Sequence, residues 1–132
     1  MTKRYFGFLC IVFLITTGCG DKIPLGGKVT FPDGEPLGVG MIFFAKDGYL
    51  ARATLNPNGS YDVGSLGQKD GLPAGTYKVY FYGTMVRDEN SKSGSEYRSL
   101  VAQEYISEKT TPLTVTVPGN KVYNIVVERP PQ

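Results

Sequence analysis

Alternate side chains on one predicted strand are the strongest candidates for chemistry in this sequence. Residues 76–82 read Thr-Tyr-Lys-Val-Tyr-Phe-Tyr, and such a run of β-branched and aromatic residues predicts a strand. Successive side chains of a strand point to opposite faces, so Lys78, Tyr80 and Tyr82 share one face. A phenol ring combines a broad apolar surface with a polar tip, and we expect this face to stack on sugar rings or to contact a partner protein.

An alternative interpretation leaves these rings covered. Residues 84–99 contain six charged residues and four serines, which predicts a surface loop. Residues 100–106 fit either one short turn of helix or an extended piece. A segment of this length often folds back onto its domain, and we expect residues 84–106 to cover the rings. If the segment does not do so, Tyr97 and Tyr105 extend the aromatic surface.

The sequence offers little to an enzyme or to a metal ion. It contains no His, which removes the commonest general base and the commonest transition-metal ligand. The twelve Asp and Glu residues make accidental carboxylate pairs inevitable, and no motif distinguishes one pair from another. Asn56, Asn58 and Ser60 alternate as calcium ligands do, but no bidentate Glu follows them, so we interpret them as a turn. We predict no catalytic residue, no metal site and no cofactor.

The elements that position the outward face are predicted to be strands. On the strand at 76–82 the inward set is Tyr77, Val79 and Phe81, which is apolar enough for a core. Both faces of the segment 39–45 are apolar, which indicates an interior strand covered on both sides. Further strands are expected at residues 25–31, 49–55, 60–63, 113–117 and 122–128. About seven short strands with no amphipathic helix predict a single all-β domain, a β-sandwich.

Turn residues separate these strands. Asn56-Pro57-Asn58-Gly59 is a strong hairpin signal between the strands at 49–55 and 60–63, because Asn and Gly tolerate left-handed backbone conformations. Pro32-Asp33-Gly34-Glu35-Pro36 follows the first strand in the same manner.

The N-terminus has the composition of a targeting segment. Lys3 and Arg4 precede a short apolar run over residues 5–15, and small residues follow. This run is shorter than the roughly 20 residues that a membrane-spanning helix needs, so a signal peptide fits better than a transmembrane anchor. Without residues 1–18 the chain keeps 12 basic and 12 acidic residues, and a neutral chain without a basic patch does not suggest nucleic acid as a partner.

Ile15-Thr16-Thr17-Gly18-Cys19 resembles the lipobox of bacterial lipoproteins. The resemblance implies cleavage before Cys19 and acylation of that residue, with the chain then held on the membrane by its lipids. Cys10 would leave with the signal, so we expect no disulfide. Asp21 does not lie directly after the Cys, where an Asp most strongly favours the inner membrane, and we therefore favour the outer membrane, on its periplasmic or surface face.

Four blocks in order resemble the carboxypeptidase regulatory-like family, whose domains are transthyretin-like sandwiches related in architecture to the immunoglobulin fold. The blocks are Gly27-Lys28-Val29-Thr30, Gly34-Glu35-Pro36-Leu37, Thr54 to Tyr61, and Leu72 to Val79. The resemblance implies an accessory module without catalytic residues of its own.

These observations together predict a lipid-anchored protein of the bacterial cell envelope. Its parts would be a signal peptide at 1–18, a lipidated tether at 19–24, the sandwich at 25–129 and a tail at 130–132. We expect a non-enzymatic structural or binding module whose ligand is an envelope protein or a polysaccharide. The alternative is an accessory subunit that stabilises an envelope enzyme or transporter. The sequence leaves the oligomeric state open.

Overall fold

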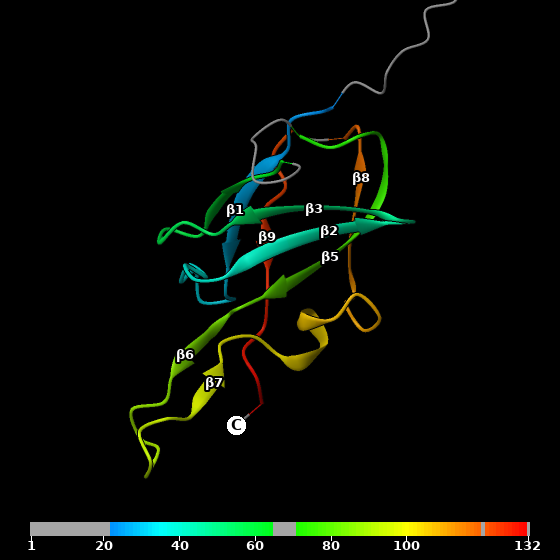
Figure 1. Ribbon diagram of the computed structural model, residues 1–132. Helices are drawn as coiled ribbons and strands as arrows, with labels where there is room; N and C mark the ends of the chain where they lie inside the picture. The colour runs from blue at the N-terminus through cyan, green and yellow to red at the C-terminus, as the bar shows by residue number, and fades with distance from the viewer. Residues whose placement is uncertain (1–21, 65–70, 120, 132) are drawn as a thin grey trace, which may run out of the picture.

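The computed structural model describes residues 22–64, 71–119 and 121–131, which form two packed sheets and a projecting hairpin (Figure 1). The strands of the sheets are β1 (Gly26–Thr30), β2 (Met41–Lys46), β3 (Tyr49–Thr54), β4 (Ser60–Asp62), β5 (Gly75–Tyr82), β8 (Leu113–Val117) and β9 (Ile125–Val126). The hairpin is made of β6 (Met85–Arg87) and β7 (Tyr97–Ser99), and a 3₁₀ helix, η2 (Gln103–Ile106), follows it.

One sheet has three strands in the order β4-β1-β9, and the other has four in the order β3-β2-β5-β8. All pairings are antiparallel except that of β1 with β9, which is parallel. The predicted all-β sandwich is therefore confirmed. The described residues contain nine strands instead of about seven, because the segment after β5 forms the β6–β7 pair.

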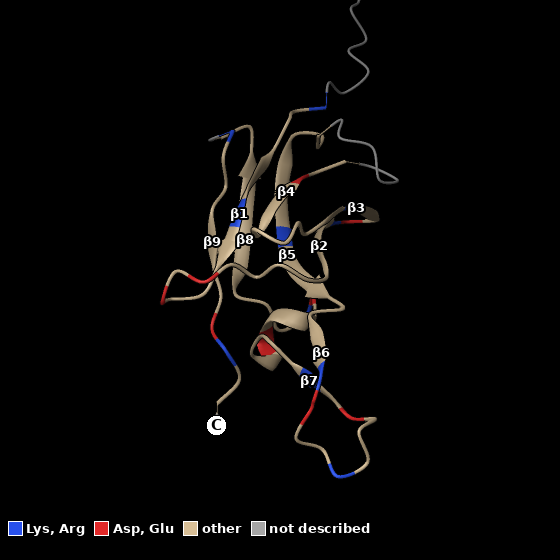
Figure 2. Ribbon diagram, turned by 90° about the vertical axis from the view of Figure 1, so that its left-hand side faces the viewer, with Lys and Arg blue, Asp and Glu red and all other residues tan. Residues whose placement is uncertain are grey.

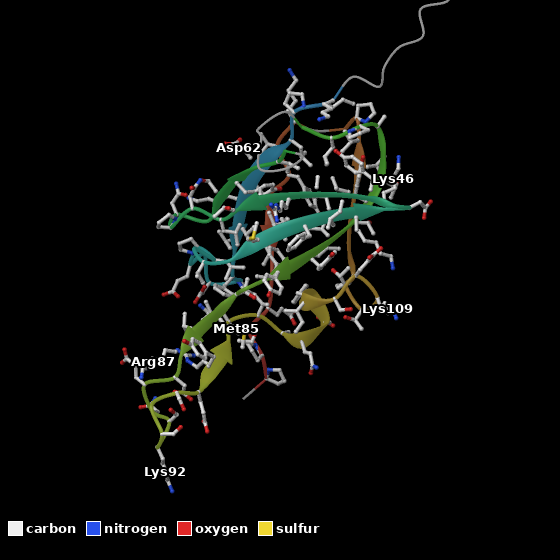
Figure 3. All side chains as sticks on the ribbon, in the orientation of Figure 1. Lys46, Asp62, Met85, Arg87, Lys92 and Lys109 are labelled. Atoms are coloured by element: carbon white, nitrogen blue, oxygen red, sulfur yellow. The ribbon has the colours of Figure 1, made fainter. Side chains whose placement is uncertain are left out.

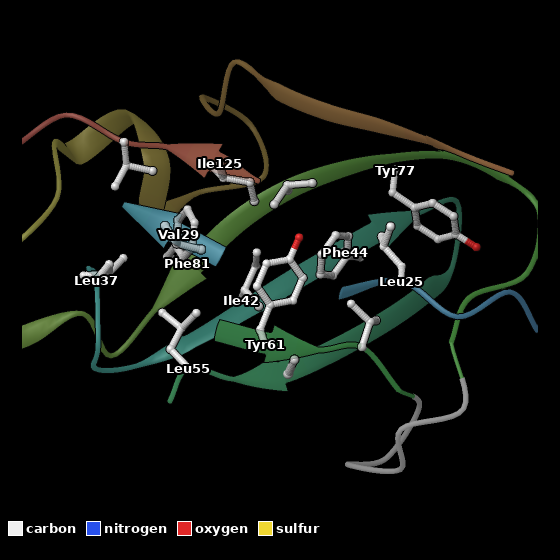
Figure 4. Close-up of a cluster of buried hydrophobic side chains, with 14 of the residues drawn as sticks. Leu25, Val29, Leu37, Ile42, Phe44, Leu55, Tyr61, Tyr77, Phe81 and Ile125 are labelled. Atoms are coloured by element: carbon white, nitrogen blue, oxygen red, sulfur yellow. The ribbon is translucent and has the colours of Figure 1, made fainter. Parts of the chain in front are cut away.

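Strand β5 organises the larger sheet. It lies between β2 and β8, and its inward side chains Tyr77, Val79 and Phe81 are all fully buried, as the alternation predicts. Ile42 and Phe44 of β2 are buried beside them (Figure 4). Burial of such side chains contributes about 1.5–3 kcal/mol each, so this face supplies much of the stability of the domain.

The three-stranded sheet closes the core from the other side. Val29 of β1, Tyr61 of β4 and Ile125 of β9 are buried against the larger sheet (Figure 4). The hydroxyl of Tyr61 donates a hydrogen bond to the carbonyl of Tyr123, which satisfies the polar atom of a buried ring. Burial also raises the pKa of the Tyr61 phenol far above its ordinary value.

The turn Asn56–Gly59 forms, and the segments on either side of it make a short antiparallel hairpin, as predicted. The Gly59 N–H donates to the Asn56 carbonyl at 2.8 Å, and Gly59 has φ of +83°. The Asn56 N–H donates to the Ser60 carbonyl at 2.9 Å, and Arg52 and Gly64 form an antiparallel bridge. The longer ladders are those of β3 with β2 and of β4 with β1, so the turn also carries the chain from one sheet to the other. Turn residues set the reversal of the chain, but the burial of both strands' apolar faces decides which neighbours they pair with.

Two predictions need correction. Strand β2 is interior as predicted, but its two faces are not equally covered: Ile42 and Phe44 are fully buried, whereas on the other face Ala45 is buried and Met41 and Phe43 are half-buried. The predicted last strand at 122–128 is regular only at β9, although a single parallel bridge at Val122 extends its pairing with β1.

The segment 84–106 is also more regular than a loop. Its ends pair as β6 and β7, which continue from β5 beyond the sandwich, and residues 103–106 adopt the short helical alternative as η2. Of the two alternatives for residues 100–106, the short helical turn is the one that forms, over residues 103–106, and its Tyr105 is buried in the core.

The predicted signal peptide at 1–18, Cys19 and the start of the predicted tether lie outside the described residues. Ile23, predicted as tether, instead exchanges two backbone hydrogen bonds with Leu72, of 2.7 and 2.8 Å. The first described residue, Lys22, lies at the end of the sandwich opposite the β6–β7 hairpin (Figures 1 and 2). Over the described ranges, no helix is both long and apolar enough to traverse a bilayer.

Candidate ligand-binding face

The outer face of the larger sheet brings aromatic side chains of two neighbouring strands together. Register places Phe43 of β2 opposite Tyr80 of β5, and Met41 opposite Tyr82. All four side chains point away from the core, because the residues between them in each strand are buried. We call Phe43, Tyr80 and Tyr82 the aromatic face.

The three rings of the aromatic face differ in what they expose. Phe43 and Tyr80 stack almost parallel, with centroids 5.3 Å apart and an interplanar angle of 13°, so each covers one face of the other. Tyr82 meets Phe43 edge-on, at 6.2 Å and 82°. Its side chain is 68% exposed, whereas Phe43 and Tyr80 are half-buried. Tyr82 is therefore the ring with an accessible surface, and the other two support it.

Charged side chains flank the aromatic face on both sides. Arg52 of β3 lies opposite Phe43, on the side away from Tyr80. Lys78 lies two residues before Tyr80 on β5, and its ammonium contacts the backbone carbonyl of Glu108 at 3.4 Å. The pKa of the Tyr80 phenol is raised, first by burial and second by the negative charge of Glu108. Tyr80 is thus neutral at physiological pH and is available as a hydrogen-bond donor.

The structure gathers most of the predicted surface but not all of it. Lys78, Tyr80 and Tyr82 share one face, as predicted. Tyr97 is exposed on β7, opposite Arg87, and makes no ring contact with another described residue. Tyr105 is a core residue and belongs to no surface. The sequence analysis missed Phe43 as a member of this surface. The alternation of residues 39–45 separates Phe43 from Ile42 and Phe44, but it does not reveal that β5 is the neighbouring strand.

The prediction that residues 84–106 cover the rings is wrong for Tyr82. The segment instead continues β5 as a ribbon and then packs η2 against it, with Tyr105 filling the core. Val101 and Tyr105 of this segment are buried in the core, whereas Met85 stays exposed on the hairpin that projects from the sandwich, where Figure 3 labels Met85, Arg87 and Lys92.

A shallow apolar hollow adjoins Tyr82. It has a volume of about 390 Å³ and lies where β5 passes into β6. Tyr82, Met85 and Ile106 line it, and these three side chains are 68%, 50% and 44% exposed. The hollow extends the accessible apolar surface from the aromatic face towards the hairpin.

Two other hollows have structural explanations. A groove of about 470 Å³ is lined by Gly26, Gly27 and residues 121–122, where the lack of side chains on the glycines lets neighbouring backbone pack closely against β1. The other, of about 460 Å³, is next to Arg129, which pairs with Asp33 at 3.1 Å and Glu35 at 3.0 Å. The Arg129 guanidinium also lies 4.1 Å from the centre of the Phe31 ring, so it fastens the chain end to the turn after β1.

The oxygens of the Asn56–Ser60 turn are used within the turn itself. Asn58 Oδ1 accepts hydrogen bonds from the backbone N–H of Ser60, at 3.0 Å, and from its hydroxyl, at 2.7 Å. Asn56 donates to the same hydroxyl at 3.0 Å. Within the described residues, no three Asp, Glu, Cys or His side chains come together as metal ligands.

Comparisons with known proteins name no family. No family model matches the chain, and no curated protein does. Among solved structures the chain is similar to a DUF3823 family protein from Bacteroides ovatus, with 25% identity and a TM-score of 0.43. The match covers 80% of this chain but only 44% of that protein, so the chain spans less than half its length. The fold assignment above rests on the sheet topology.

Proposed function

We propose that this protein is a lipid-anchored, non-enzymatic module of the cell envelope that binds a polysaccharide through its aromatic face. The observation that carries the proposal is Tyr82, an accessible ring held perpendicular to a stacked pair of rings. A single exposed aromatic is ordinary, but a ring that packs edge-on against Phe43, which is itself stacked on Tyr80, loses little conformational freedom when it binds.

The groups around Tyr82 suit a sugar. A sugar ring presents C–H bonds on its faces, which stack on an aromatic ring, and hydroxyls around its rim. The Tyr80 and Tyr82 hydroxyls, Arg52 and Lys78 supply hydrogen-bond donors around the accessible ring. Support for a non-enzymatic role comes from the sequence, which contains no His and resembles an accessory domain, the carboxypeptidase regulatory-like module.

The anchor and the aromatic face are compatible in space. If Cys19 carries the lipid, three residues lie between it and Ile23, which is fixed to Leu72, so four Cα–Cα steps join the two. Four extended residues span at most about 14 Å, so the sandwich would sit close to the bilayer. The β6–β7 end, with Tyr82 near its base, would face away from the membrane and towards envelope polymers (Figure 1).

The binding proposal is tested with a matched pair of tyrosine variants. Tyr82 and Tyr97 are 68% and 65% exposed, but only Tyr82 belongs to the aromatic face. We expect Tyr82→Ala to weaken binding of the full chain to envelope polysaccharides about tenfold, since an aromatic contact contributes about 0.5–1.5 kcal/mol. Tyr97→Ala should bind as the wild type does, in affinity electrophoresis or titration calorimetry. Equal losses in both variants, or no binding of the wild type to any envelope polysaccharide, would refute the proposal.

The anchor is tested by intact mass and membrane fractionation of the natively expressed protein. We expect the wild type to begin at Cys19, to carry added acyl mass and to sediment with membranes. Cys19→Ser should stay uncleaved or become soluble. An unacylated wild type with residues 1–18 still attached would refute the proposed lipid anchor.

A protein partner is the second candidate, and the hollow beside Tyr82 favours it. Met85 and Ile106 are large apolar side chains that a protein interface would cover. This candidate corresponds to an accessory subunit of an envelope enzyme or transporter. Met85→Glu would then abolish co-purification of a specific envelope protein while leaving polysaccharide binding intact.

A further inference from the structure

Two cations beside the aromatic face lack carboxylate partners. Arg52 and Lys78 are both exposed, and neither forms an ion pair with any carboxylate of the described chain. Arg129, by contrast, is neutralised by two carboxylates on the far side of the fold. Many other charged residues lie on turns and on the hairpin (Figure 2), so the two cations give the outer face of the larger sheet a local positive charge.

The position of these cations matches the aromatic face. Arg52 and Lys78 occupy neighbouring rows of the sheet, with Phe43 and Tyr80 between them. Two strand spacings and two residues along a strand put their Cα atoms about 12 Å apart. A ligand of more than one sugar ring is long enough to reach both cations at this spacing.

One acidic residue lies near this surface. The Glu108 backbone carbonyl accepts from Lys78, and its side-chain charge acts on Tyr80. Lys109 follows it in the chain and offsets that charge. The surroundings of the aromatic face are therefore net positive, which complements an anionic ligand.

We infer that the ligand of the aromatic face is an acidic polysaccharide, a polymer of sugars that carry carboxylates. A sugar ring stacks on Tyr82, and carboxylates of the same chain pair with Arg52 and Lys78. The planar guanidinium of Arg52 can hold a carboxylate through two parallel hydrogen bonds, which favours a carboxylate over a neutral hydroxyl. This inference rests on the proposed function and adds the chemical class of its ligand.

The test compares two probes that differ only in charge, polygalacturonate and its fully methyl-esterified, neutral form. The full chain, purified in a neutral detergent, is titrated with each at low salt. We expect at least a fivefold preference for polygalacturonate, and the preference should shrink as salt screens the charges.

Charge variants then assign that preference to residues. Arg52→Gln and Lys78→Gln should each weaken polygalacturonate binding about two- to fivefold, the range expected for exposed ion pairs. Glu108→Gln should strengthen it by a similar factor. Lys28→Gln serves as the matched control, because Lys28 is an exposed lysine on β1 of the other sheet. Binding of the neutral form should weaken less than binding of polygalacturonate in the Arg52→Gln and Lys78→Gln variants, because it loses a hydrogen bond but no ion pair, and Lys28→Gln should change neither.

The outcomes separate the inference from the proposed function. Equal affinity for both probes, or unaltered polygalacturonate binding by the Arg52→Gln, Lys78→Gln double variant, would overturn the inference. If Tyr82→Ala still weakened binding of both probes in that case, the proposed binding of a polysaccharide by the aromatic face would be supported, although the preference for an acidic polymer would be refuted. If neither these probes nor any envelope polysaccharide bound the wild type, both would fail. All substituted side chains are exposed, and unchanged melting temperatures confirm that the variants fold.

Discussion

The two faces of β5 should contribute very differently to stability, and adjacent residues provide the comparison. Phe81 is fully buried between the sheets, whereas the neighbouring Tyr82 is 68% exposed on the outer face. Phe81→Ala removes a buried ring and leaves a cavity, at a cost of about 3–5 kcal/mol. The free energy of unfolding of a domain this size is about 5–15 kcal/mol, so this variant loses a large share of its stability.

Tyr82→Ala should cost much less. About a third of the side chain is covered, which corresponds to roughly 65 Å² of a ring that buries about 200 Å² in full. At about 25 cal/mol per Å² the loss is about 1–2 kcal/mol. The binding variant is therefore expected to stay folded.

Urea unfolding followed by far-ultraviolet circular dichroism measures both effects. With a slope of about 2 kcal/mol per molar, the unfolding midpoint should fall by about 2 M for Phe81→Ala and by less than 1 M for Tyr82→Ala. Equal losses, or a loss below 1 kcal/mol for Phe81→Ala, would refute the division of β5 into a core face and a ligand face.

Three further predictions concern the smaller sheet and its surroundings. Gly27→Ala should prevent or severely weaken folding, because a Cβ there would lie 2.0 Å from the backbone carbonyl oxygen of Tyr123, and soluble yield with circular dichroism reports it. Burial raises the pKa of the Tyr61 phenol, so the ring stays neutral in the folded state while the unfolded chain ionises near pH 10. The contribution of Tyr61 to the free energy of unfolding is therefore intact below pH 10 and is lost as the pH rises further. Melting temperatures should fall above pH 10, and less steeply in Tyr61→Phe. The pKa of the Asp33 carboxyl is lowered, first by the Glu35 backbone N–H and then by Arg129. The contribution of Asp33 to the free energy of unfolding should therefore be present above about pH 4 and lost below it. Melting temperatures of the wild type and of Asp33→Asn, compared across this pH range, measure the loss.

The local parts of the fold could be predicted from the sequence. The alternation of β5 separated Tyr77, Val79 and Phe81 from Lys78, Tyr80 and Tyr82, and burial follows that division. Period-two patterns and turn residues are local signals, and they are read without knowing the rest of the chain. The all-β class followed from them.

Pairing between strands could not be predicted in the same way. The sequence predicts the short hairpin between β3 and β4 but not that β4 forms its longer ladder with β1, because that choice depends on contacts between distant residues. The stack of Phe43 on Tyr80 has the same origin, since it arises only from the register of β2 against β5. The β6–β7 pair escaped notice because its residues are largely polar and carry little alternation.

The most direct test of the binding proposal is to see which tyrosine rings a bound polysaccharide touches. The protein contains nine tyrosines and no tryptophan, so ring resonances of isotopically labelled tyrosine can be assigned by substitution. During titration with polygalacturonate we predict that the resonances of Tyr82 and, less strongly, Tyr80 shift, while those of Tyr97 and buried Tyr61 stay in place. Shifts confined to Tyr97, or no shift at Tyr82 under saturating ligand, would contradict the assignment of the aromatic face as the binding surface.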